Sequence, residues 1–146
     1  MKSLKFKKIM NSVNQGSFQI INAAAGSGKT FSLVYRYLKK LLSAETDDVF
    51  RSMLALTFTN KAVNEMKGRI LNFLFFLSSD PNNEKIITIH RMLIKDLHFS
   101  EKILQDKSRR VLKKILHEYA AFEVITLDSF THKIIRTFAR DLKIPL

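Results

Sequence analysis

The sequence predicts an α/β fold in which a parallel sheet is flanked by helices. Three short apolar segments, 18–24, 52–58 and 123–127, have the length and composition of buried strands. Each is followed by a segment with helical periodicity, and strands that alternate with helices form parallel sheets. Ligands of such sheets bind at the carboxyl ends of the strands, so functional residues are expected directly after each strand.

The composition favours one compact domain with a basic surface. With 146 residues, 46% hydrophobic content and twelve Phe, the chain can bury a sizeable core. Lys and Arg number 25 against 13 Asp and Glu, and the net charge of +12 suits a polyanionic partner. A solvated surface charge without any partner is the alternative. Cysteine is absent, which excludes disulfides and thiolate metal sites, and the four His show no paired ligand spacing.

No segment carries a signal for export or membrane insertion. The longest apolar run, 73–77, is far shorter than the about 20 residues that span a bilayer. Residues 1–17 are basic and then polar, without the apolar core of a signal peptide. We therefore expect a cytoplasmic protein without a membrane partner, in which 1–17 form a lead-in and 18–146 form the domain.

The first predicted strand leads into a glycine-rich loop with the residue types of a phosphate-binding loop. The loop consists of Ala23, Ala24, Ala25, Gly26, Ser27, Gly28, Lys29 and Thr30. Gly26 and Gly28 allow the backbone N–H groups to turn toward a phosphate, and the following helix adds its N-terminal dipole. Lys29 is expected to reach the β- and γ-phosphates, and Thr30 to place its hydroxyl on Mg²⁺. The generic pattern begins with Gly where Ala23 stands, and an ordinary Gly-Ser turn before Lys-Thr is the alternative.

The elements after the loop continue the alternation of helix and strand. Apolar residues recur at helical spacing over 29–43 and again over 60–78, so each segment predicts a helix that packs one face on a sheet. Between them, the acidic stretch 45–48 indicates a loop, and 52–58 is the second strand. Turn-forming residues at 78–83 end the second helix.

Residues 84–121 are predicted to form a helical insertion. They carry nine basic and five acidic side chains and have a polar break at 105–110. The third strand, 123–127, follows, and after it a helix over 129–142 with Phe130 as a core residue on its apolar side.

Three segments in this order carry a family resemblance. They are 23–30, 56–66 (Leu-Thr-Phe-Thr-Asn-Lys-Ala-Val-Asn-Glu-Met) and 125–130 (Ile-Thr-Leu-Asp-Ser-Phe). The chain resembles the N-terminal motor domain of UvrD/Rep-like superfamily 1 DNA helicases, and is most similar to the AddA/RecB helicase-nuclease branch. That family accepts Ala at the start of the glycine-rich loop. The resemblance covers about residues 18–142 and implies a RecA-like P-loop NTPase fold that is incomplete here.

The resemblance implies ATP and Mg²⁺ as cofactors and assigns single-stranded DNA contacts to the ends of the second and third strands. The six residues that match these motifs are Thr57, Phe58, Thr59, Asn60, Thr126 and Ser129. Hydroxyl and amide groups beside a helix N-terminus suit a phosphate backbone, which supports the assignment. Thr59 or Asn60 could instead only cap the following helix, and Asp128 is expected to cap the last one.

The resemblance implies an ATP-dependent DNA helicase that translocates on single-stranded DNA and unwinds duplex DNA in repair or recombination. Its expected partners are DNA and a nuclease domain or subunit. Hydrolysis needs a carboxylate pair and arginines, which the family places downstream of the third motif, so we expect no catalytic residue in this stretch and no activity from it alone.

Two other function classes use the same loop. One is a small P-loop phosphotransferase, which would also need an acceptor-site carboxylate and lid arginines. The other is a stand-alone module that binds nucleotide and single-stranded DNA without catalysis, and it would explain the charge equally well.

Overall fold

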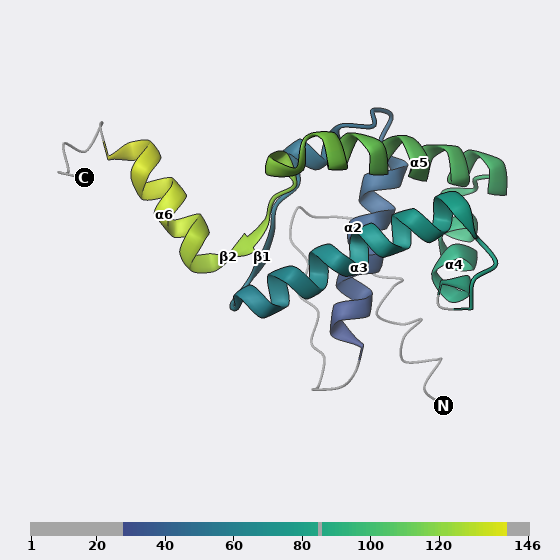
Figure 1. Ribbon diagram of the computed structural model, residues 1–146, viewed down its shortest axis with the longest axis horizontal. Helices are drawn as coiled ribbons and strands as arrows, with labels where there is room; N and C mark the ends of the chain where they lie inside the picture. The colour runs from purple at the N-terminus through teal and green to yellow at the C-terminus, as the bar shows by residue number, and fades with distance from the viewer. Residues whose placement is uncertain (1–27, 85, 140–146) are drawn as a thin grey trace, which may run out of the picture.

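The computed structural model describes residues 28–84 and 86–139, which form a helix-rich structure with a small parallel sheet (Figure 1). The lead-in 1–17, the predicted strand 18–24 and the loop residues 23–27 lie outside the described residues. In chain order the elements are α2 (Lys29–Ser43), the 3-10 helix η1 (Val49–Ser52), β1 (Ala55–Thr57), α3 (Asn60–Ser79), α4 (Ile87–Leu97), α5 (Glu101–His117), the 3-10 helix η2 (Tyr119–Ala121), β2 (Val124–Thr126) and α6 (Leu127–Phe138).

The sheet pairs β1 with β2 in parallel, as the sequence predicts. Ala55 lies opposite Val124 and Thr57 opposite Thr126, so both strands end at the same edge. Each strand is shorter than predicted, because only three residues of each pair in the ladder and Val49–Ser52 turn into a 3-10 helix. The predicted strand bounds 52–58 and 123–127 are therefore wrong, although the two strands exist.

The core lies where α2, α3 and α5 meet beside the sheet, and α4 packs against α2 (Figure 1). Leu38 on α2, Leu74 on α3 and Val111 on α5 have no exposed surface. The predicted helices 29–43 and 60–78 are confirmed to within one residue as α2 and α3. Among the described residues, no helix is both long enough and apolar enough to cross a membrane.

The polar break predicted at 105–110 is wrong, because α5 runs without interruption from Glu101 to His117. The Ser100 side chain caps its start by accepting a hydrogen bond from the Ile103 N–H at 3.3 Å. Polar residues in the middle of α5 are buried against the neighbouring helices instead of facing water, Lys107 and Ser108 among them. These polar residues therefore make tertiary contacts and do not interrupt the helix.

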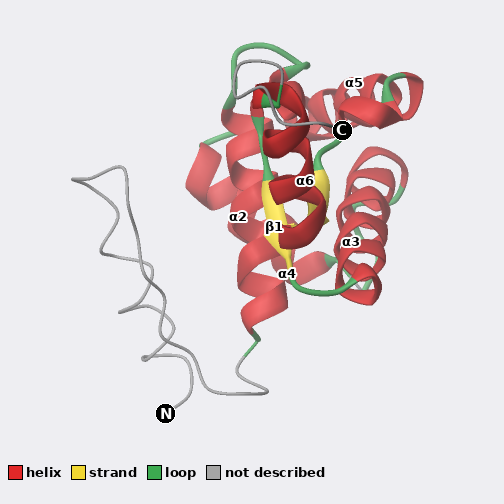
Figure 2. Cartoon of the chain, turned by 90° about the vertical axis from the view of Figure 1, so that its left-hand side faces the viewer, coloured by secondary structure: helices red, strands yellow, loops and turns green. Residues whose placement is uncertain are grey.

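Helix α6 begins at Leu127 and packs loosely, with no buried residue (Figure 2). Its apolar side chains Ile134, Ile135 and Phe138 are 42%, 44% and 51% exposed. Phe130, predicted as a core residue, is only half-buried, which corrects that prediction. It lines a hollow of about 350 Å³ between α6 and residues 51–54.

Candidate functional site

The start of α2 presents an open helix N-terminus. Gly28 precedes it with φ 80°, a left-handed conformation that side chains rarely adopt, and the space where a Cβ would stand is empty to 4 Å. Lys29 and Thr30 follow in the exposed first turn, and no side chain caps the turn. The N–H groups at this end can therefore face an anion. Ala23–Ser27, the other residues of the predicted loop, lie outside the described part of the chain.

The second and third motifs meet at the carboxyl edge of the sheet. Thr57 and Thr126 are partners in the strand register, so the residues that follow them leave the sheet side by side. The Thr57 hydroxyl donates to the Thr59 carbonyl oxygen at 3.2 Å, which holds the turn into α3. This edge and the start of α2 lie at the same end of the molecule, the lower end in both views (Figures 1 and 2).

A threonine caps each of the two helices that start at this edge. Thr59 Oγ1 accepts from the Ala62 N–H at 3.1 Å, so this residue has the capping role that the sequence left open. Thr126 Oγ1 accepts from the Ser129 N–H at 3.2 Å and donates to Ser129 Oγ at 2.9 Å. The prediction that Asp128 caps the last helix is wrong, because the helix starts one residue before Asp128 and its cap is Thr126.

The predicted DNA residues differ in how accessible they are. Phe58 projects from the turn between β1 and α3 with 87% of its surface exposed. Asn60 and Ser129 are also exposed, whereas Thr126 keeps only 8% of its surface. Phe58, Asn60 and Ser129 can therefore reach a ligand directly, while the buried Thr126 holds Ser129 in place.

Positive side chains near this edge serve different purposes. Lys61 is exposed in the first turn of α3. Further along α3, the Lys67 ammonium lies 4.8 Å from the centre of the Tyr119 ring, a cation–π contact within the fold. Arg69 forms an ion pair with Glu65 at 2.7 Å. Of these three cations, only Lys61 is close in sequence to the turn that carries the second motif.

Sequence reasoning missed the polar contacts that hold α2. The Tyr35 hydroxyl and the Lys39 ammonium both donate to Asp96 Oδ2 on α4, at 2.7 and 2.8 Å. Burial raises the pKa of Tyr35, and the hydrogen bond to Asp96 and the charge of Asp96 raise it further. Burial alone would raise the pKa of Asp96, but the hydrogen bonds from Lys39 and Tyr35 outweigh it and lower that pKa. No local pattern signals these contacts, because the partners are 57 and 61 residues apart.

Comparison with known proteins identifies the family. The UvrD/REP helicase N-terminal domain matches residues 5–145. An ATP-dependent helicase/nuclease subunit from Carboxydothermus hydrogenoformans is 29% identical over 141 residues, which are 96% of this chain and 10% of that protein. The proteins of the same name from Bacillus cytotoxicus and Staphylococcus haemolyticus are 31% and 41% identical over 86% and 62% of this chain, and 8% of each is covered.

The chain spans about a tenth or less of the length of these curated relatives. No solved structure matches it. The family match, in contrast, covers nearly every residue and includes all three motifs. The chain therefore belongs to the UvrD/REP helicase N-terminal domain family.

Proposed function

We propose that this chain is the ATP-binding part of an ATP-dependent DNA helicase, which translocates on single-stranded DNA and unwinds duplex DNA in repair or recombination. The observation that carries the proposal is the meeting of the motifs at one end of the molecule, where the start of α2 lies near the ends of β1 and β2 (Figure 1). The family match and the names of the relatives support the same interpretation. We keep the RecA-like P-loop fold, with 84–121 as a helical insertion, as part of this proposal.

The proposed cofactors are ATP and Mg²⁺. Gly26, Gly28 and Lys29 would hold the triphosphate, and the Thr30 hydroxyl would hold Mg²⁺. The left-handed Gly28 and the uncapped first turn of α2 fit this role, because they leave backbone N–H groups open to an anion. When bound, the nucleotide supplies the phosphoanhydride bond whose hydrolysis drives movement along DNA.

The proposed DNA-binding surface is the carboxyl edge of the sheet. Thr57, Thr59 and Asn60 would meet the phosphate backbone together with the first N–H groups of α3. The exposed Phe58 ring offers a face on which a base can stack. Ser129 would add a hydroxyl from the start of α6, oriented by its hydrogen bond with Thr126.

The remaining parts of the machine belong to a longer protein in this proposal. The catalytic carboxylates and arginines would follow the third motif, so these 146 residues should bind their ligands without unwinding DNA. The relatives are named for both a helicase and a nuclease, and the partner that we propose is therefore a nuclease domain or subunit. The proposed location is the cytoplasm.

The test of the nucleotide site compares two lysines of α2. Lys29→Ala removes the cation from the proposed phosphate site, whereas Lys40→Ala removes an exposed cation from the other end of the same helix. Binding of a fluorescent ATP analogue with Mg²⁺ should be lost in Lys29→Ala and retained in Lys40→Ala, with circular dichroism unchanged in both. Unchanged nucleotide affinity in Lys29→Ala would refute the assignment.

A further inference from the structure

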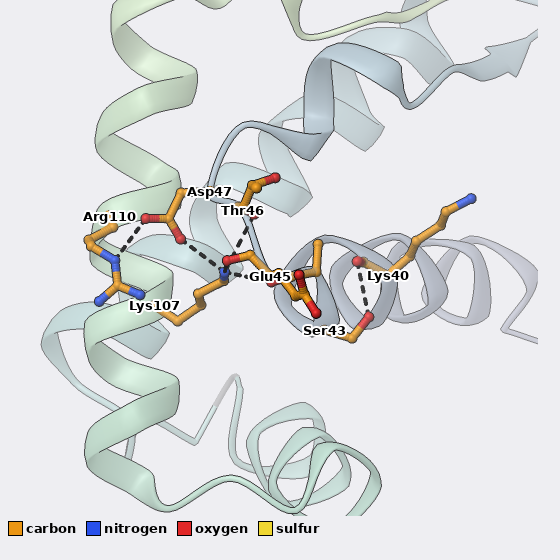
Figure 3. Close-up of polar contacts among 8 residues, drawn as sticks. Lys40, Ser43, Glu45, Thr46, Asp47, Lys107 and Arg110 are labelled. Atoms are coloured by element: carbon orange, nitrogen blue, oxygen red, sulfur yellow. Dashed lines mark hydrogen bonds and ion pairs between the residues drawn. The ribbon is translucent and has the colours of Figure 1, made fainter.

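Helix α2 carries the proposed phosphate site at one end and is held by polar contacts at two other points. The first point is Asp96 of α4, which binds Tyr35 and Lys39 in the middle of α2. The second is the end of α2, where Lys107 of α5 reaches the chain that leaves the helix (Figure 3). Both contacts come from the predicted insertion, for which the sequence suggests no role.

Lys107 is the most buried charged side chain among the residues that the structure describes, with 8% of its side chain exposed. Its ammonium lies 2.7, 3.3 and 3.4 Å from the carbonyl oxygens of Ala44, Glu45 and Thr46. It also forms an ion pair with Asp47 Oδ1 at 3.0 Å, and Arg110 binds the other oxygen of that carboxylate at 2.8 Å. A buried ammonium is stable only with such partners, and the C-terminal end of a helix favours a cation.

The same helix also holds the end of α3. Gln105 Nε2 and Arg109 Nη2 both donate to the Ser78 carbonyl oxygen at 3.2 Å. Helix α5 thus contacts the C-terminal ends of α2 and α3, whose N-terminal ends carry the first and second motifs. The stretch predicted as a polar break, 105–110, is the part of α5 that makes these contacts.

Two separated points fix the direction of a rigid rod. Helix α2 has 15 residues and is therefore about 22 Å long, so a small shift at its last turn also moves its first turn. Since Gly28, Lys29 and Thr30 are exposed, the packing at the middle and end of the helix must set where they lie.

We propose that Lys107 is a positioning residue of the nucleotide site, which fixes the end of α2 and so directs its first turn toward the phosphates. The inference rests on the proposed function. It gives the inserted helices a task, because they hold the phosphate-binding helix in register with the helix that follows the second motif.

The experiment compares Lys107→Met with Lys102→Met, which changes an exposed lysine of the same helix. Binding of a fluorescent Mg·ATP analogue, measured at low temperature where circular dichroism shows folded protein, should weaken about tenfold in Lys107→Met. Affinity for a single-stranded oligonucleotide should stay within about twofold, because α3 keeps its own contacts with Gln105 and Arg109. Lys102→Met should behave as wild type, and Lys107→Arg should restore most of the nucleotide affinity.

A stability control separates positioning from general loosening. Val111→Ala removes a fully buried side chain of α5 and destabilises the fold without touching the end of α2. If it weakens nucleotide binding as much as Lys107→Met does, the positioning role is excluded. The role is equally excluded if folded Lys107→Met binds nucleotide as wild type does.

Two further outcomes are informative. If Lys107→Met does not fold, Asp96→Ala tests the same idea at the other anchor, where weakened nucleotide binding supports it and normal binding overturns it. If the wild-type chain itself binds no Mg·ATP, the proposed function fails, and this result is distinct from failure of the positioning role.

Discussion

The ion pair between Asp47 and Lys107 has the smallest exposed side-chain fractions, 17% and 8%, of the ion pairs in the described residues. Burial by itself would raise the pKa of Asp47, because it penalises the charged form. Hydrogen bonds from Arg110 and Lys107 and the charges of both side chains outweigh that penalty, so the pKa lies below its usual value. The folded state therefore holds Asp47 charged more strongly than the unfolded chain does.

This difference predicts how stability depends on pH. A carboxyl whose pKa is lowered by folding stabilises the fold above its unfolded pKa of about 4, and this contribution is lost as pH falls toward the lower folded value. We expect Asp47→Asn to lower the free energy of unfolding at pH 7 and to make that free energy less sensitive to acid between about pH 5 and 2. Urea unfolding across this range measures both effects.

Glu84→Gln, at an exposed carboxylate, is the control for Asp47→Asn. Wild type and the control should lose stability in parallel as pH falls. An acid sensitivity of Asp47→Asn equal to that of wild type would contradict the role given to this carboxylate.

Helices α3 and α6 show how capping decides where an element begins. Both start shortly after a strand, and in both a threonine hydroxyl accepts an N–H of the first turn. In the sequence, Thr59, Asn60 and Asp128 are all acceptable caps. Only the geometry of the turn out of the sheet selects Thr59 for α3 and Thr126 for α6.

This selection predicts a difference between neighbouring substitutions. Thr59→Ala removes the side-chain acceptor of the Ala62 N–H and should cost about 1 kcal/mol of stability. Asn60→Ala should be nearly neutral, because Asn60 is already the first residue of α3 and alanine favours helix. Urea unfolding followed by far-UV circular dichroism distinguishes the two. An equal loss in both variants would mean that the cap is shared.

The whole molecule combines a basic charge with a localised aromatic side chain. The net charge of +12 should attract any nucleic acid, and that attraction weakens as salt rises, because the release of counterions then contributes less. Phe58, in contrast, is exposed at the edge where the second and third motifs meet, and stacking on a base does not depend on counterion release. The two contributions can therefore be separated by salt.

We expect single-stranded DNA to bind without nucleotide and to bind less tightly as salt rises. Phe58→Ala should weaken binding about tenfold or more at every salt concentration while leaving the slope against salt unchanged, because base stacking contributes about 1–3 kcal/mol. Fluorescence anisotropy with a labelled oligonucleotide provides the measurement.

Phe75→Ala is the matched control, an aromatic residue that is 53% exposed near the other end of α3. It should bind as wild type does. If Phe58→Ala and Phe75→Ala bind equally well, the sheet edge is not the DNA surface. If no single-stranded DNA binds at low salt, a phosphotransferase becomes the better interpretation.

The features that local sequence encodes were predictable. The 3.6-residue period of apolar side chains is enough to place α2 and α3, and the order of strand, helix and motif is enough to identify the family. The glycine-rich loop and the residues after β1 and β2 follow from the same patterns. Their ligands remain proposals, because the motif shows the chemistry that the residues can perform and contains no ligand.

The tertiary structure decided what depends on residues far apart in the chain. It set the length of β1 and β2, because a strand extends only as far as its partner pairs. It kept α5 continuous through 105–110, because the polar groups there find carbonyl oxygens at the ends of other helices. Lys107 and Ala44 are 63 residues apart, a separation at which periodicity and propensity carry no information. Sequence by itself thus determined the elements and the family, and long-range packing determined which polar side chains hold those elements in place.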